Sequence, residues 1–133
     1  MGLYLCVFNE ERNDELAASE IGSYADFGCF RDAVARHLDA ETLPVLMLHS
    51  DCDGEWPVDD LESLLAELEA VRERFKELPA EQIANAFEHS VKHREGAEDL
   101  YGCFHDVYGV NLIDALMGLA KVGLKAGRPI SFQ

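Results

Sequence analysis

The sequence predicts an α+β protein in which a small mixed β-sheet of about four strands packs against roughly three to four helices. Short apolar runs rich in β-prone residues stand near both ends and in the middle of the chain. Between them, apolar residues recur three and four positions apart, the spacing of an amphipathic helix. Since the 133 residues contain no internal repeat and no linker rich in Pro, Gly or Ser, we expect a single domain over residues 1–133.

The amino-terminal part predicts a hairpin followed by a helix. Residues 3–8 form an apolar run, the polar turn NEERND follows, and residues 16–21 can return as a second strand. Ser23 stands three residues before Asp26, which is the spacing of a helix capping box. The next apolar positions have helical spacing, at Tyr24, Phe27, Phe30, Val34 and Leu38. We therefore expect the first helix to begin after Ser23.

The middle of the chain predicts a buried strand, a polar loop and a long helix. Residues 43–48, LPVLML, are almost continuously apolar, as is typical of a strand covered on both faces. After the loop, apolar residues trace one helical face up to Pro79: Val58, Leu61, Leu64, Leu65, Leu68, Val71, Phe75 and Leu78. Asp59 with Glu62 is expected to cap this helix. A further helix is expected over residues 80–91.

The carboxyl-terminal part predicts an aromatic segment, a helix and a last strand. Residues 100–107, LYGCFHDV, end in a turn, and Asn111 can cap a helix that stops before Gly127. Gly118 and Gly123 are unusual inside this helix because each costs up to ~1 kcal/mol relative to alanine. We expect both to permit close packing against a neighbouring element. Residues 129–133 are expected to form the terminal strand.

The charge of the chain restricts its partners. Twenty-six Asp and Glu residues against eleven Lys and Arg residues give a formal net charge of −15. Such a field repels phosphate backbones and anionic membranes and attracts basic proteins or cations. We therefore expect a protein partner, and neither nucleic acid nor a membrane.

Two further sequence features point to the cytoplasm. The amino terminus lacks the basic region of a signal peptide, and no uncharged apolar stretch approaches the ~18–20 residues that span a bilayer. The four cysteines contain no C-x-x-C pair, which favours reduced thiols over a disulfide framework or a structural zinc site. We therefore predict a cytoplasmic protein without a cofactor.

The stretch HSDCDGEWP, residues 49–57, gathers a histidine, a cysteine, three carboxylates and the only tryptophan of the chain. Its spacing does not fit an EF-hand calcium loop, because Gly54 stands at position 4 from Asp51 and not at position 6. Ser50 is not surrounded by a G-x-S-x-G motif, so no nucleophilic hydrolase is indicated.

A transition-metal site is the alternative interpretation of this loop. His49, Asp51 and Cys52 carry suitable ligand atoms, and the pair His89 and His93 has the spacing of one helical face. The pair lacks the glutamate of the H-E-x-x-H motif of metalloproteases. A small metal-dependent enzyme that uses the loop from His49 to Asp53 therefore remains the alternative function.

Segments along nearly the whole chain resemble the bacterial immunity protein 70 family. They are GLYLCVF (2–8), GSYADFGCFRD (22–32), PVLMLHSDCDGEW (44–56), LYGCFHDVYG (100–109) and GRPISFQ (127–133). The most specific pieces are HSDCDGEW and PISFQ. The resemblance implies an α+β fold and an antitoxin that binds and neutralises a polymorphic toxin delivered between competing bacteria. It assigns no catalytic residue and does not identify the toxin.

The acidic segment 51–69 is the candidate toxin-binding surface, since it holds eight acidic residues and no Lys or Arg. A basic toxin, such as a nuclease that binds phosphate, would be attracted to it and associate faster by electrostatic steering. The candidate toxin-binding residues are Asp51, Asp53, Glu55, Trp56, Asp59, Asp60 and Glu62.

Two interpretations of Trp56 stay open. Tryptophan is enriched among the residues that dominate binding energy, so Trp56 could anchor an interface. Alternatively, the loop could satisfy its own backbone through side-chain hydrogen bonds while Trp56 folds over the start of the next helix. The sequence leaves the oligomeric state undetermined.

Overall fold

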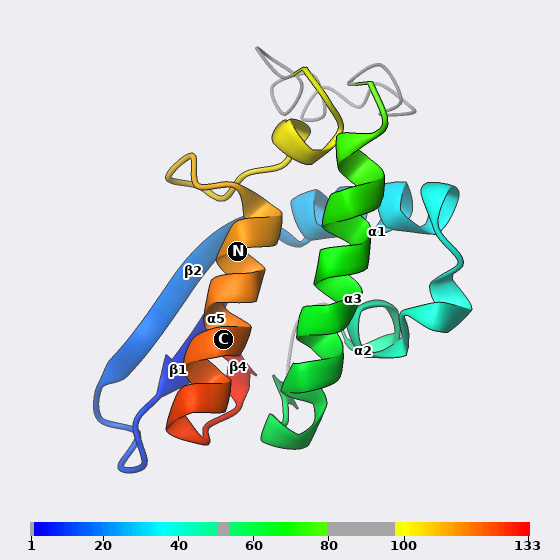
Figure 1. The fold of residues 1–133 in the computed structure, drawn as a ribbon. Coiled ribbons are helices and arrows are strands. Elements are labelled where there is room, and N and C mark those ends of the chain that lie inside the picture. The colour runs from blue at the N-terminus through cyan, green and yellow to red at the C-terminus, as the bar shows by residue number, and fades with distance from the viewer. Residues whose placement is uncertain (1, 51–53, 80–97) are drawn as a thin grey trace.

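Four strands form one sheet in the computed structural model, which describes residues 2–50, 54–79 and 98–133 (Figure 1). The strands are Gly2–Phe8 (β1), Glu15–Ser23 (β2), Glu55–Trp56 (β3) and Ile130–Phe132 (β4), in the order β2-β1-β4-β3. The predicted α+β class and the four strands are confirmed. The sheet is antiparallel and not mixed, because all three strand pairs in the described ranges run in opposite directions.

The amino-terminal hairpin and helix form where the sequence predicts them. β1 and β2 pair along their length, and helix α1 spans Tyr24–His37. The Ser23 hydroxyl accepts from the Asp26 backbone N–H at 3.0 Å, while the Asp26 carboxylate accepts from the Ser23 backbone N–H at 2.9 Å. This reciprocal pair is the capping box, and it confirms the predicted start of α1.

The predicted buried strand over residues 43–48 is wrong. Pro44–Leu48 is instead the short helix α2, which follows the 3₁₀ helix η1, Ala40–Thr42. Proline suits the first turn of a helix because its missing N–H would have no intrahelical acceptor there. Leu48 is 80% exposed, so the segment is not covered on both sides.

Helix α3, Val58–Lys76, confirms the predicted long helix, although its start differs from the expectation. Pro57 occupies the N-cap position without a side-chain cap, so the predicted cap by Asp59 and Glu62 is wrong. Asp59 and Asp60 lie in the first turn, where carboxylates interact favourably with the helix dipole. The helix predicted over residues 80–91 lies outside the described residues.

Helix α5, Leu112–Ala126, begins where Asn111 accepts a hydrogen bond from the Asp114 N–H at 3.2 Å, as predicted. A Cβ at Gly123 would lie 2.5 Å from a methyl carbon of Leu61 and 2.7 Å from the Arg128 carbonyl oxygen, which confirms close packing there. The same expectation is wrong for Gly118, because a Cβ added there would have no neighbour within 4 Å.

The helices and the sheet enclose one hydrophobic core. Leu3, Leu5 and Val7 of β1 belong to this core together with buried residues of α1, α3 and α5. Figure 1 shows α5 lying across the sheet, with α3 beside it. None of the helices in the described ranges is long and apolar enough to cross a membrane.

Candidate functional site

His49 directly follows α2, and its ring contacts Ser50 and Glu55. Its Nδ1 lies 2.7 Å from the backbone oxygen of Ser50, and its Nε2 lies 2.8 Å from the backbone oxygen of Glu55. The imidazole also stacks on the Phe132 ring at a centroid distance of 4.2 Å. Both ring nitrogens are thus directed at backbone carbonyl oxygens of neighbouring residues. The geometry of His49 is that of a structural residue.

Trp56 belongs to the core and not to the surface. Its side chain is 1% exposed, and its ring meets Phe132 edge-on at a centroid distance of 4.8 Å. Its indole N–H donates to the Val45 carbonyl oxygen at 2.9 Å, which joins β3 to α2. This placement favours the structural interpretation of Trp56, since a partner could touch its side chain only if the loop opened.

The described carboxylates of the candidate site lie at one end of α3 and on the strand before it. Glu55, Asp59 and Glu62 are exposed, and Asp60 is half-buried. The ion pairs found within the described residues, Arg72–Asp114 and Arg74–Glu77, include none of these four side chains. Among the described residues, no Lys or Arg forms an ion pair with them. Asp51 and Asp53 lie outside the described residues.

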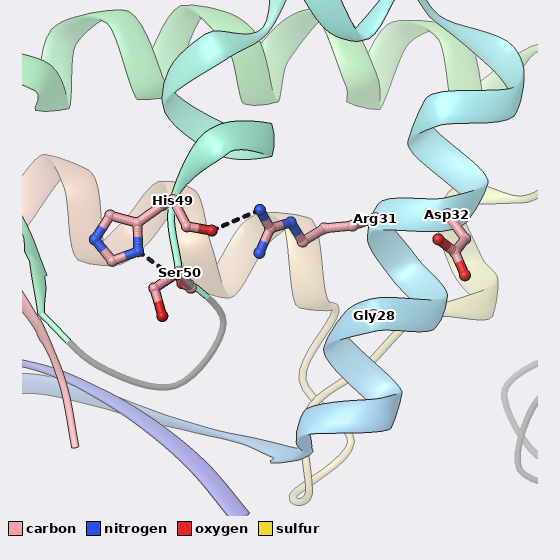
Figure 2. Close-up of a pocket in the computed structure, with 5 residues that line it drawn as sticks. All are labelled: Gly28, Arg31, Asp32, His49 and Ser50. Atoms are coloured by element: carbon pink, nitrogen blue, oxygen red, sulfur yellow. Dashed lines mark hydrogen bonds between the residues drawn. The ribbon is translucent and has the colours of Figure 1, made fainter.

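A pocket of about 400 Å³ lies between α1 and the end of α2 (Figure 2). It is lined by Gly28, Arg31, Asp32, His49 and Ser50. Arg31 reaches across it from α1 and donates to the backbone oxygens of Met47 and His49, the latter at 2.7 Å. These carbonyls lie at the carboxyl end of α2, where a helix leaves carbonyl groups without partners. Arg31 therefore fixes α2 against α1.

Sequence reasoning missed the role of Arg31. Within the motif GSYADFGCFRD it looks like a solvated charge on the polar side of an amphipathic helix. Its guanidinium also lies 5.1 Å from the Phe27 ring centroid, a cation–π arrangement. A predicted helix over residues 43–48 would have indicated that its last carbonyl groups need a donor such as Arg31. The sequence predicts a strand there, so this need was not evident.

The metal-dependent alternative receives no support from the described residues. In those ranges no group of three or more His, Cys, Asp or Glu side chains is placed to hold a metal ion. Asp51, Cys52, His89 and His93 lie outside the described residues. The metal site therefore stays a prediction.

Comparison with known proteins gives one result. A family model described as immunity protein 70 matches residues 3–132, nearly the whole chain. No curated protein and no solved structure matches the chain.

Proposed function

The chain belongs to the immunity protein 70 family, and from this premise we propose that it is a cytoplasmic protein that binds and neutralises a cognate polymorphic toxin in bacterial competition. The match over residues 3–132 is the observation that carries the proposal. The proposed mechanism is stoichiometric occlusion of the toxin, without turnover and without a cofactor.

The charge of the chain supports a basic toxin. The net charge is −15, and Glu55, Asp59, Asp60 and Glu62 place acidic groups together without a described ion-pair partner. Nucleases that bind phosphate are themselves basic, so an acidic inhibitor can mimic the charge of their substrate. We therefore propose a basic nuclease as the toxin and these four carboxylates, with Asp51 and Asp53, as the acidic surface that attracts it.

A titration of toxin activity tests the mechanism of neutralisation. The family resemblance implies that the antitoxin is encoded beside its toxin. We expect the toxin domain encoded by the neighbouring reading frame to lose its activity linearly with added protein and to reach zero at about one equivalent, as tight inhibitors do. Treating the purified inhibitor with a chelator, which is removed before the toxin is added, should leave the inhibition unchanged. Inactivation that progresses with time at substoichiometric amounts would instead indicate an enzyme and contradict the proposal.

The rate of association tests the electrostatic part of the proposal. Raising the ionic strength shortens the Debye length from ~30 Å at 0.01 M to ~8 Å at 0.15 M. We expect association with the toxin to slow by about 10-fold or more over this range, whereas dissociation changes little. Stopped-flow mixing measures both rates.

Matched variants sharpen this test. Asp59→Asn and Glu62→Gln remove charge from exposed positions without changing side-chain size much. Each should flatten the salt dependence of association. Glu62→Gln should leave unfolding nearly unchanged, whereas Asp59→Asn also removes a first-turn carboxylate of α3 and should cost up to about 1 kcal/mol. An association rate of the unmodified protein that does not depend on salt would exclude electrostatic steering but not the antitoxin role.

A further inference from the structure

The sheet has a second face that no described helix covers. Successive side chains of a strand point to opposite faces, so Leu3, Leu5 and Val7 face the helices whereas Tyr4, Cys6 and Phe8 point away from them. The core cluster contains the first three residues and buried residues of α1, α3 and α5, and it contains none of the second three.

The pairing of residues between strands shows which residues of β2, β3 and β4 lie on this second face. Cys6 of β1 pairs with Ala18 of β2 on one side and with Ser131 of β4 on the other, and Ser131 pairs with Glu55 of β3. Glu55 points to this face because its neighbour Trp56 points into the core. We define the outer sheet face as Tyr4, Cys6, Phe8, Ala18, Glu20, Glu55 and Ser131. Cys6 and Ser131 are buried at 0% and 4% exposure, so a partner would contact the other five.

Tyr4, Phe8 and Ala18 are the apolar residues of the outer sheet face that a partner could contact. Tyr4 and Phe8 are half-buried, and Ala18 is exposed. Tyr108 borders the face with 77% of its surface exposed, and a hydrogen bond to Glu20 raises the pKa of its hydroxyl. An exposed tyrosine is typical of protein interfaces, because its ring is apolar and its hydroxyl is polar.

Carboxylates lie beside these apolar residues. The Glu15 side chain accepts a hydrogen bond from the Tyr4 hydroxyl at 2.9 Å, Glu20 lies opposite Tyr4 in the β1–β2 register, and Glu55 stands at the β3 end. Burial and the neighbouring Glu15 raise the pKa of the Cys6 thiol to about 11, so Cys6 adds no charge near pH 7. The outer sheet face thus presents both negative charge and apolar side chains.

Two arginines, Arg12 and Arg128, lie at one end of this face, and both interact with Phe8. The Arg12 guanidinium lies 5.0 Å from the centroid of the Phe8 ring, and the Arg128 Nε donates to the Phe8 carbonyl oxygen at 3.2 Å. Toward Glu20 and Glu55 the described part of the face carries no lysine or arginine. A complementary partner must therefore bring positive charge to those two carboxylates.

We propose that the outer sheet face is the surface on which the toxin docks, through a basic protein surface that places Lys or Arg side chains against Glu15, Glu20 and Glu55 and apolar side chains against Tyr4 and Ala18. This inference rests on the proposed function. A second copy of the chain fits poorly, because each copy carries a net charge of −15. The carboxylates of α3 continue the negative charge beyond Glu55 and steer the partner toward the face.

Ala18→Arg tests the docking surface. The exposed methyl group of Ala18 is replaced by a long cationic side chain in the row that also contains Cys6, Ser131 and Glu55. We expect the affinity for the purified toxin domain encoded by the neighbouring reading frame to fall by about 100-fold or more, because bulk and like charge oppose a basic partner. Calorimetry or surface binding measures the affinity.

Ala35→Arg is the matched control, since Ala35 is also exposed but lies on α1. It should change the affinity by less than about threefold. Glu55→Lys provides a second variant on a different strand and should weaken binding by about 10-fold or more. Circular dichroism melts of all three variants verify that each is folded before binding is compared.

Glu62→Lys separates this proposal from docking on the acidic start of α3. Glu62 is exposed on α3 and is not part of the outer sheet face. The proposal predicts that it slows association but costs far less affinity than Ala18→Arg. If Glu62→Lys abolishes binding and folded Ala18→Arg binds normally, the docking inference is overturned and the antitoxin role stands. If the unmodified protein does not bind the toxin, the proposed function fails and the docking inference with it.

Discussion

Replacing Trp56 with alanine is expected to lower the free energy of unfolding by about 3–5 kcal/mol, the usual cost of removing a large buried aromatic side chain. The indole is 1% exposed and packs against the stacked pair of His49 and Phe132 rings, at centroid distances of 5.4 and 4.8 Å. Its removal leaves a cavity and leaves the Val45 carbonyl oxygen without the indole donor. Urea unfolding followed by circular dichroism measures the change.

Trp56→Phe is the matched variant. A phenyl ring keeps part of the packing against Phe132 but cannot donate to Val45, so we expect a smaller loss of about 1–2 kcal/mol. The folded Trp56→Phe protein should bind the toxin as tightly as the unmodified chain, because the buried ring is not a contact residue. Unchanged stability of Trp56→Ala together with lost toxin binding would restore Trp56 as an interface anchor.

Local signals in the sequence predict much of this fold. The capping box of Ser23 and Asp26, the Asn111 cap and the long apolar stripe of α3 each lie within one element, and the structure forms all three as predicted. Such features need only neighbouring residues, because a capping hydrogen bond or a helical stripe spans a few turns. Predictions from these local features are reliable because they depend only on residues that are close in the sequence.

The segment 43–48 shows where local reasoning fails. A continuous apolar run of six residues fits a buried strand and a buried helix equally well. In this chain the helix is favoured by Pro44 in its first turn, by Glu67 of α3 at one end and by Arg31 of α1 at the other. Both polar partners lie outside the run, at positions that no local pattern connects to it.

The candidate site was predictable in composition but not in geometry. The acidic character of residues 51–69 is evident in the sequence, and Glu55, Asp59 and Glu62 are exposed as a partner-binding surface requires. The burial of Trp56 was not predictable, because it depends on Phe132 and Val45. The outer sheet face was also hidden, since GLYLCVF is apolar on both faces and only strand register shows which residues face away from the helices.

Glu67→Ala is expected to lower the free energy of unfolding by about 2–4 kcal/mol, because hydrogen bonds to a charged acceptor contribute about 1.5–3 kcal/mol each and unsatisfied buried donors add a penalty. The Glu67 carboxylate is 8% exposed and accepts from the backbone N–H groups of Leu46 at 2.9 Å and Val45 at 3.3 Å. These donors lie in the first turn of α2, where a helix has no acceptors of its own.

Two comparisons distinguish this capping role from a general effect of changing α3. Glu69→Ala alters an exposed glutamate of the same helix and should change stability by no more than about 0.5 kcal/mol. Glu67→Gln keeps one acceptor oxygen and should cost about half as much as Glu67→Ala. Hydrogen exchange at the Val45 and Leu46 amides should accelerate in Glu67→Ala more than exchange in the middle of α5, because the cap holds α2 locally. If Glu67→Ala and Glu69→Ala are equally stable, the α2 segment does not depend on Glu67, and its helical conformation must have another cause.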